Sequence, residues 1–185
     1  MIHRKGKLGL GTAYIEGFKL CLAQGADAIV QMDADFSHNP ARIKPLLENL
    51  KDYHMVLGSR YVRGGRLDDR WAAWRKSLSS FGNLYARIIL GLPILDVTGG
   101  FRAWRRETLL GIPIDRVRSQ GYAFQVEMAY ITHMSGYRIK EIPIYFAERE
   151  RGDSKMSWAI QFEAARRVWA ILYEYRDLKK KRLLD

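Results

Sequence analysis

The chain has 185 residues, of which 48% are hydrophobic and 28% charged, and its formal net charge at pH 7 is +11. This composition excludes a disordered chain, the single cysteine excludes an internal disulfide, and no apolar run reaches the roughly 18 residues that a membrane-spanning helix needs. The positive surplus indicates an anionic partner: nucleic acid, a phosphorylated small molecule or an acidic membrane surface.

The first half of the chain alternates predicted helices and strands. Apolar residues at helical spacing predict a helix over residues 11–24, and the apolar run at 26–33 predicts a buried strand. Asn39 followed by Pro40 is a helix-start signal, and the helix is expected to end near residue 50.

The second half continues this alternation. We expect a strand over residues 54–60, a helix over 72–91, and a turn with a short strand and helix over 95–111. A helix over 121–135, an extended strand over 137–150 and a long amphipathic helix over 157–178 follow. The order predicts one α/β domain over residues 1–185, with a mostly parallel sheet flanked by helices. Residues 157–185 form its C-terminal amphipathic helix and basic tail.

Two acidic residues follow the first predicted strand. Asp33 and Asp35 stand one residue apart at the end of this apolar run. The carboxyl ends of strands in open α/β sheets are where ligands bind, and carboxylate oxygens suit Mg²⁺ or Mn²⁺. An Asx turn that caps the following helix explains the same pattern equally well.

The N-terminal stretch from Gly6 to Gly11 is rich in glycine. Its G-x-x-G-x-G spacing fits neither a dinucleotide fingerprint nor a P-loop, and there is no room upstream for the strand that a dinucleotide site requires. A structural turn is the better interpretation.

Polar and basic clusters follow the other predicted strands. Asp96 and Thr98 share a glycine-rich turn, and Gln125 and Glu127 lie at a helix start, where capping would also explain Glu127. Arginines crowd the segment after the second strand, either as a solvated surface or for phosphate recognition: Arg60, Arg63, Arg66, Arg70 and Arg75. A polar loop with the composition of a phosphate lid carries Arg149, Arg151 and Lys155.

Seven blocks of sequence follow one another over nearly the whole chain: "GKLGLGTAY", "MDADFSHNP", "GSRYVRGG", "WRKSLSSFGN", "DVTGGFRAWRR", "GYAFQVEM" and "RERGDSKM". In this order they resemble the polyprenol-phosphate (dolichol-phosphate) mannosyltransferases of glycosyltransferase family 2. The resemblance implies a GT-A-type, Rossmann-like fold. It also implies inverting transfer of mannose from GDP-mannose to a polyprenyl phosphate, with Mg²⁺ or Mn²⁺.

The resemblance also implies roles for individual residues. Asp33 and Asp35 would hold the metal, with Ser37 as a weaker ligand, because the family commonly carries Gln at that position. Arg60 would act at the catalytic centre. Phosphate and acceptor contacts would fall on Arg60, Arg75, Ser79, Arg149 and Lys155. The polar clusters themselves add further candidate substrate contacts: Asp96, Thr98, Gln125, Glu127 and Arg151. The acceptor phosphate is largely dianionic at neutral pH and needs little help from a base.

The chain departs from the family pattern at its N-terminus. Family members begin with a strand, a helix and another strand that bind the nucleotide, whereas this chain starts near their "GKLGLG" block. We therefore expect an N-terminally truncated domain with an exposed strand edge. A related family 2 transferase that uses a UDP-sugar on a lipid phosphate is the alternative. A basic nucleic-acid-binding module is less favoured, because no RNA-recognition or recognition-helix signature is present.

The C-terminal segment predicts contact with a membrane or with the sheet. The predicted helix has an apolar stripe, and Lys179 to Arg182 add a basic cluster; the stripe consists of Trp158, Phe162, Ala165, Trp169, Leu172 and Tyr173. One interpretation is packing on the sheet. The other is docking on anionic lipid, so that the protein is cytoplasmic and peripheral on the cytoplasmic face of the membrane.

Overall fold

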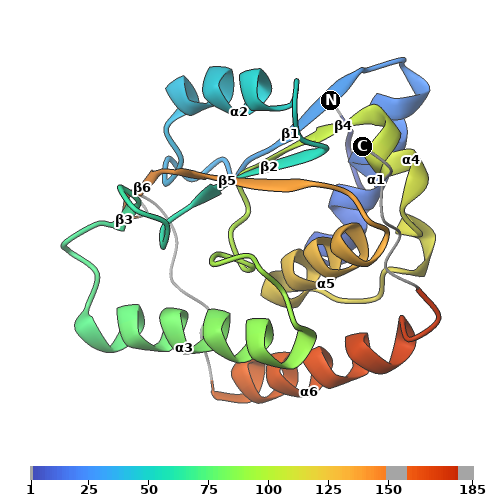
Figure 1. Cartoon of the computed structure of the whole chain (residues 1–185). Helices are drawn as coiled ribbons and strands as arrows, with labels where there is room; N and C mark the ends of the chain where they lie inside the picture. Colours follow the sequence, from blue (N-terminus) through green and yellow to red (C-terminus); the bar gives the residue numbers. More distant parts are fainter. Residues whose placement is uncertain (1, 149–157, 179–185) are drawn as a thin grey trace.

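The computed structural model describes residues 2–148 and 158–178, without the side chains of residues 158–162. Its main sheet has four strands between layers of helices (Figure 1). The strand order is β1 (Ala28–Gln31), β4 (Arg102–Arg105), β2 (Met55–Ser59), β5 (Ile139–Pro143). β4 pairs antiparallel with β1 and with β2, and β2 pairs parallel with β5.

The predicted α/β fold is confirmed, but the sheet is mixed rather than mostly parallel. β1, β2 and β5 run in one direction, and β4 runs against them between β1 and β2. Arg102, the first residue of β4, lies opposite Gln31 and Leu57 near the ends of β1 and β2. The chain thus enters β4 at this edge, without the crossover that a parallel strand needs. The loop before β4 therefore meets the segments that follow β1 and β2.

Helices cover both faces of the sheet. α2 (Ile43–Asn49) lies on one face, and α1 (Leu10–Ala23) and α5 (Gly121–Met134) lie toward the other. α3 (Ala73–Leu90) and α6 (Trp158–Glu174) run side by side on the α5 side, far from α2 (Figure 1). The sheet therefore separates α2 from the α3–α6 pair.

The core has two parts, one on each face of the sheet. The larger part includes Trp104, Phe124, Ile131 and Ile171 and joins the sheet to α1, α5 and α6. The smaller part lies beneath α2 and contains Leu46, Val56, Phe101, Ala103 and Ile144. Burial of each large apolar side chain contributes about 1.5–3 kcal/mol.

The predicted helices are present, with small shifts at their ends. Asn39 caps the 3₁₀ turn before α2, since its Oδ1 accepts a hydrogen bond from the backbone N–H of Ala41 at 2.9 Å. The short helix predicted after β4 is also present. The remaining helical elements are the 3₁₀ turns Pro40–Arg42 and Ile114–Arg116 and helix α4 (Arg106–Gly111).

The extended strand predicted over residues 137–150 is divided between two sheets. Its first part is β5, and its second part, β6 (Tyr145–Phe146), pairs in parallel with β3 (Arg66–Leu67) in a small separate sheet. The division carries Phe146 from the main sheet to the neighbourhood of the arginine-rich segment.

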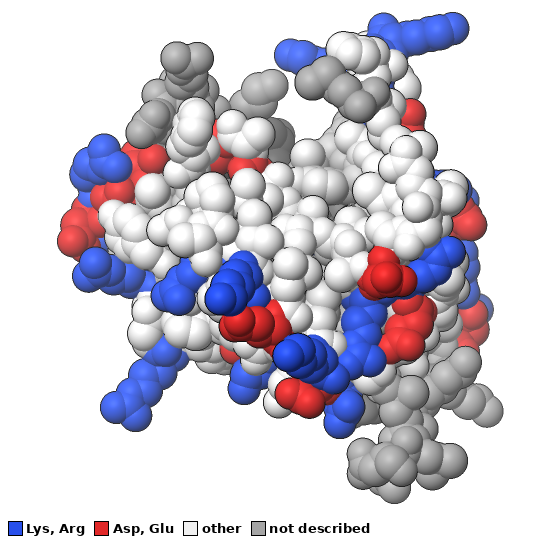
Figure 2. Space-filling model, turned by 90° about the horizontal axis from the view of Figure 1, so that it is seen from above, with Lys and Arg blue, Asp and Glu red and all other residues white. Residues whose placement is uncertain are grey.

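Charged side chains on the α2 side of the molecule are mixed in sign. Figure 2 shows lysine and arginine at the margins of this face, next to aspartate and glutamate, around a mainly uncharged centre. Over the described residues of this face, the net charge of +11 is therefore not gathered into one basic patch.

Candidate active site

The acid pair lies in the loop that follows β1, at the edge where β1 and β2 end. Asp35 Oδ1 accepts hydrogen bonds from the backbone N–H of Ser37 at 3.1 Å and from its hydroxyl, which forms an Asx turn. Phe36 has a φ of 63°, in the left-handed region that bulky side chains rarely adopt. The turn considered as the alternative to metal binding is thus present, and it holds a strained loop of the kind found at functional sites.

Asp33 is fixed by contacts from two directions. The hydroxyl of Tyr14, on α1, donates a hydrogen bond to its Oδ1 at 3.2 Å. Its backbone N–H donates to Nδ1 of His38 at 3.3 Å. His38 is buried, with ring centroids 5.0 Å from Phe101 and 5.1 Å from Phe146. Burial lowers the pKa of His38, although the nearby acids act in the opposite direction, so a neutral imidazole accepts this bond.

Arg60 and Asp96 form a buried ion pair beside the acid loop. Arg60 Nε donates to Asp96 Oδ2 at 2.7 Å and Nη2 to Oδ1 at 2.6 Å, and the backbone N–H of Arg60 donates to Oδ2 at 2.9 Å. Burial opposes the charge of Arg60, but the carboxylate of Asp96 outweighs it and raises the pKa of Arg60 above its usual value. Nη2 also donates to Thr98 Oγ1 at 2.9 Å. No described residue accepts a hydrogen bond from Nη1, which leaves that donor for a ligand.

The loop that carries Asp96 is held by buried side chains. Glu141 on β5 accepts hydrogen bonds from the backbone N–H groups of Leu95 and Asp96 at 2.7 and 2.9 Å. Arg102 is completely buried, and burial lowers its pKa to about 10, so it stays charged at neutral pH. It donates at 2.8 Å to the carbonyls of Val97, Gly99 and Gln125.

Asn83 ties α3 to the same loop. Its Oδ1 accepts from the backbone N–H of Thr98, and its Nδ2 donates to Thr98 Oγ1, both at 3.1 Å. One turn earlier, Ser79 Oγ accepts a hydrogen bond from the hydroxyl of Tyr61 at 2.8 Å. The predicted residues Ser79 and Thr98 are therefore brought together with Arg60.

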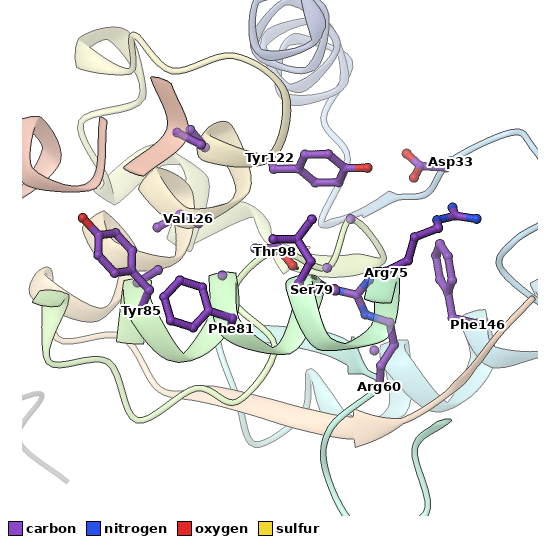
Figure 3. Close-up of a pocket in the computed structure, with 18 of the residues that line it drawn as sticks. Asp33, Arg60, Arg75, Ser79, Phe81, Tyr85, Thr98, Tyr122, Val126 and Phe146 are labelled. Atoms are coloured by element: carbon purple, nitrogen blue, oxygen red, sulfur yellow. Dashed lines mark hydrogen bonds between the residues drawn. The ribbon is translucent and has the colours of Figure 1, made fainter. Parts of the chain in front are cut away.

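Asp33, His38, Arg60, Ser79 and Thr98 line one pocket of about 320 Å³ (Figure 3), whereas the predicted residues Asp35 and Asp96 are not part of its lining. One end is polar and holds Asp33, Arg60, Arg75, Ser79 and Thr98. The other end runs between α3, α5 and α6 and is apolar, with Phe81, Tyr85, Val126, Ala165 and Val168. Tyr122 lies across the pocket with its hydroxyl directed toward Asp33 (Figure 3). The pocket therefore suits a ligand with an anionic head and an apolar chain.

Arg75 extends from the first turn of α3 into the polar end. Its Nη1 donates to Glu148 Oε1 at 3.1 Å, and its guanidinium lies 4.3 Å from the centre of the Trp71 ring. Its Nε is buried and has no hydrogen-bond partner among the described residues. The stacked guanidinium is thus preorganised near the pocket.

Gln125 and Glu127, predicted as substrate contacts, do not line the pocket. Gln125 Oε1 accepts a hydrogen bond from Gln31 Nε2 at 2.8 Å, which joins α5 to β1. Glu127 is completely buried and accepts hydrogen bonds from the Ser119 backbone at 2.7 Å and from the Tyr175 hydroxyl at 2.9 Å. In this structure both side chains hold α5 to its neighbours.

The glycine-rich stretch at the N-terminus packs against the loop before α5. The backbone N–H of Gly11 donates to Gln120 Oε1 at 2.9 Å. A Cβ on Gly11 would lie 2.5 Å from the carbonyl oxygen of Ser119, and one on Gly9 would lie 2.3 Å from Gln120 Oε1. These glycines permit close packing, in agreement with the structural interpretation.

Several predicted features lie outside the described residues. These are the lid cations Arg149, Arg151 and Lys155, the tail from Lys179, and the side chains of Trp158 and Phe162. Sequence reasoning also missed residues that the structure places at the site. Tyr14, His38 and Asn83 belong to the quoted blocks, so their place in those blocks was the available signal.

Within residues 2–148 and 158–178, no helix combines the length and the apolar character needed to cross a bilayer. The same part of the chain contains no group of three or more His, Cys, Asp or Glu arranged to hold a metal. Asp33 and Asp35 would therefore need further ligands from a bound molecule.

Comparison with known proteins gives the family. Glycosyl transferase family 2 matches residues 1–111. The undecaprenyl-phosphate mannosyltransferase of Micrococcus luteus is 46% identical over 181 residues, which cover 97% of this chain and 74% of the relative. The polyprenol monophosphomannose synthase of Mycolicibacterium smegmatis is 42% identical over 174 residues, which cover 92% of this chain and 65% of the relative.

Solved structures share the fold at low sequence identity. A mycobacterial protein superposes with a TM-score of 0.57 at 21% identity, over 92% of this chain and 52% of that chain. Glucosyl-3-phosphoglycerate synthase from Mycobacterium tuberculosis, solved with Mg²⁺ and UDP, superposes with a TM-score of 0.58 at 17% identity, over 92% of this chain and 56% of that chain. This chain thus spans about half of each structure, and the likeness confirms the GT-A-type fold. Together with the family match and the 46% identical relative, it shows that the chain is a glycosyltransferase and belongs to glycosyl transferase family 2.

Proposed function

We propose that the chain carries the acceptor pocket and metal-binding loop of an enzyme that transfers mannose from GDP-mannose, with inversion, to a polyprenyl phosphate. The observation that carries the proposal is a pocket with a polar end at Arg75 and Ser79 and an apolar end at Phe81 and Val168. The names of the two relatives, which contain undecaprenyl phosphate, polyprenol and mannose, support the same substrates.

The side chains present fit a divalent cation at Asp33. Its Oδ1 accepts the hydrogen bond from Tyr14, and its Oδ2 accepts none from a described residue. Asp33 also forms no ion pair within the part of the chain that the structure describes, so a metal would not compete with an arginine or a lysine. Bound Mg²⁺ or Mn²⁺ would neutralise the charge of the departing nucleoside diphosphate. Diphosphate oxygens would complete its ligands beside Asp33 and Asp35.

The remaining residues of the site position the acceptor phosphate. Arg60, held by Asp96, and Arg75, held by Glu148 and Trp71, carry fixed positive charge on the same side of the pocket. Preorganised charges of this kind stabilise negative charge without reorganisation during the reaction. The acceptor oxygen is already anionic near neutral pH, so the chemistry needs no strong side-chain base.

The experiment measures transfer and acceptor binding separately. The chain, joined to the nucleotide-binding strand, helix and strand with which family members begin, is incubated with Mn²⁺, a polyprenyl phosphate and either GDP-mannose or UDP-glucose, and the lipid product is identified by mass spectrometry. We expect mannose on the lipid phosphate, with loss of product in Asp33→Ala. Farnesyl phosphate, a short and soluble lipid phosphate, is titrated in parallel by calorimetry. Transfer of glucose instead of mannose would contradict the proposed donor. A chain that binds no farnesyl phosphate would contradict the proposed acceptor.

A further inference from the structure

Tyr61 contacts the polar end of the pocket without being part of the pocket lining. It lies two residues after the end of β2, and its hydroxyl donates a hydrogen bond to Ser79 Oγ on α3 at 2.8 Å. Ser79 lines the pocket, whereas Tyr61 does not. An influence of the Tyr61 hydroxyl on a ligand in the pocket would therefore pass through Ser79.

The backbone of Tyr61 is fixed by the end of β2. Its N–H donates to the hydroxyl oxygen of Ser59 at 3.3 Å, and Ser59 is completely buried. The preceding N–H, that of Arg60, donates to the Asp96 carboxylate at 2.9 Å. The Tyr61 ring also lies against the Arg60 guanidinium, whose central carbon is 5.3 Å from the ring centre. The hydroxyl of Tyr61 is thus held in place from both the backbone and the ring.

The hydrogen bond from Tyr61 leaves the hydrogen of the Ser79 hydroxyl available. A serine hydroxyl has one hydrogen to donate and two lone pairs that accept. The bond from Tyr61 occupies one lone pair of Ser79 Oγ, and no described residue accepts the hydrogen of Ser79. Because Ser79 lines the pocket, a ligand in the pocket can accept that hydrogen.

A serine inside a helix has a competing partner for this hydrogen. Serine and threonine hydroxyls in helix interiors often donate to the carbonyl four residues earlier. Thr132 in α5 does so, since its Oγ1 donates to the Met128 carbonyl at 2.7 Å. Ser79 also lies inside its helix, with the carbonyl of Arg75 four residues earlier, but within the described structure it donates no such bond. Its Oγ contacts Tyr61 instead.

The direction of the Ser79 hydrogen matters for a phosphate ligand. The oxygens of a fully ionised phosphate only accept hydrogen bonds, so a hydroxyl beside them has to donate. Ser79 lies with Arg60 and Arg75 at the polar end of the pocket (Figure 3). The two guanidinium groups supply positive charge there, and an inward hydrogen on Ser79 would add one charge-assisted hydrogen bond.

We propose that Tyr61 is a positioning residue of the acceptor site: its hydroxyl holds Ser79 so that the Ser79 hydroxyl donates to the phosphate of the lipid acceptor. This inference rests on the proposed function, because it takes the polar end of the pocket as the place of that phosphate. Tyr61 itself touches neither substrate. Without its hydroxyl, Ser79 is free to turn and donate to the Arg75 carbonyl, as Thr132 does to Met128.

The experiment is a double-mutant cycle on the binding of farnesyl phosphate, measured by calorimetry. We expect the dissociation constant to rise by about tenfold in Ser79→Ala and by about fivefold in Tyr61→Phe, since the first removes a hydrogen bond to a charged group and the second misdirects it. In the Ser79→Ala background, Tyr61→Phe should have no further effect. A merely structural role of Tyr61 would weaken binding equally in both backgrounds, and that result would overturn the proposal.

Two matched controls remove the same groups elsewhere. Tyr53→Phe deletes the hydroxyl of a half-buried tyrosine beside the smaller core, and Ser80→Ala deletes that of the exposed serine next to Ser79. Neither residue lines the pocket, so both variants should bind farnesyl phosphate like the parent chain. Losses in these controls as large as in Tyr61→Phe and Ser79→Ala would show that the effect is not specific to this pair, and would overturn the proposal.

The remaining outcomes separate the role of Tyr61 from the proposed function. Unchanged or tighter binding in Tyr61→Phe, together with weaker binding in Ser79→Ala, would overturn the role of Tyr61 and leave the acceptor pocket in place. Unchanged binding in Ser79→Ala would overturn the inference as well, because Tyr61 would have no contact to position. A parent chain that binds no farnesyl phosphate would contradict the proposed acceptor, and the role of Tyr61 would fall with it.

Discussion

Arg60 and Asp96 form a buried pair in which the guanidinium donates two side-chain hydrogen bonds, at 2.6 and 2.7 Å, to the two carboxylate oxygens. Asp96→Asn preserves the size of the side chain but removes the charge that offsets Arg60. A buried charge that loses its partner costs about 3–5 kcal/mol. We expect the free energy of unfolding to fall by an amount in this range, as measured by urea denaturation.

The matched control is Asp177→Asn, which neutralises an acid in an exposed ion pair with Arg116 at 2.7 Å. Exposed pairs contribute little to stability, so this variant should unfold at the same urea concentration as the parent chain. If Asp96→Asn were as stable as the parent chain, other groups would have to offset the charge of Arg60. The pair with Asp96 would then not be what orders this loop.

A second prediction concerns the pH dependence of stability. His54 is largely buried, and its Nδ1 accepts the backbone N–H of Arg138 at 3.2 Å. Burial, and then the charge of Arg105, lower its pKa below the usual 6.5. The unfolded chain therefore binds the proton more readily than the folded chain. The contribution of His54 to stability is complete above the pKa that His54 has in the unfolded chain. It is lost as the pH falls toward the lower pKa that His54 has in the folded chain.

His54→Asn tests this prediction, because asparagine keeps an acceptor near the position of Nδ1 and does not titrate. A tenfold difference in proton affinity between the folded and unfolded states is worth about 1.4 kcal/mol. We expect the loss of unfolding free energy between about pH 7.5 and about pH 5.5 to be smaller in the variant. Part of the loss will remain, since the pKa of His38 is also lowered. Identical pH profiles would show that His54 contributes nothing to the acid sensitivity.

The hydrogen bond from Tyr14 to Asp33 leads to a third prediction, which depends on the proposed metal site. Burial, and then the charge of Asp33, raise the pKa of Tyr14 well above its usual value, so the phenol remains a donor at neutral pH. Tyr14→Phe keeps the stacking on Phe124 and removes only the hydroxyl. A hydrogen bond to a charged group is worth ~1.5–3 kcal/mol, so we expect Mn²⁺ affinity to fall by about tenfold.

Mn²⁺ binding is measured by electron paramagnetic resonance in the presence of the donor, without a transfer assay. Tyr173→Phe, at an exposed position on α6, is the control and should bind Mn²⁺ like the parent chain. Unchanged affinity in a correctly folded Tyr14→Phe variant would mean that the orientation of Asp33 does not depend on Tyr14.

Much of the pocket could be predicted from short sequence blocks. Asp33, Arg60, Ser79 and Thr98 belong to four separate blocks, and the structure brings them together. The physical reason is that two of these blocks follow strands of the same direction, and β4 starts at the edge where those strands end. Arg75 belongs to the same helical block as Ser79, one turn earlier in α3.

Other features could not be predicted, because local patterns carry no information about them. A four-residue strand such as β4 has the same apolar pattern in either direction, so its antiparallel pairing was missed. The sequence pattern placed Glu127 at a helix start, but its partners include Tyr175, which is 48 positions further along the chain. Nothing in the sequence singled out Arg102, whereas its burial and its three carbonyl partners show that it supports the loop.

The last prediction concerns the acceptor end of the pocket. Arg75 presents its guanidinium over Trp71 and next to Ser79, at the end of the pocket proposed to hold the lipid phosphate. Arg75→Ala removes a charge-assisted hydrogen bond worth ~1.5–3 kcal/mol, so we expect the dissociation constant for farnesyl phosphate to rise by about tenfold or more, with Mn²⁺ binding unchanged. Arg63→Ala is the matched control, because Arg63 is an exposed arginine of the same basic segment and does not line the pocket. Arg75→Lys should fall between the two, since it retains the charge but not the planar fork. Equal losses in Arg75→Ala and Arg63→Ala would assign the effect to net charge and would remove Arg75 from the acceptor site.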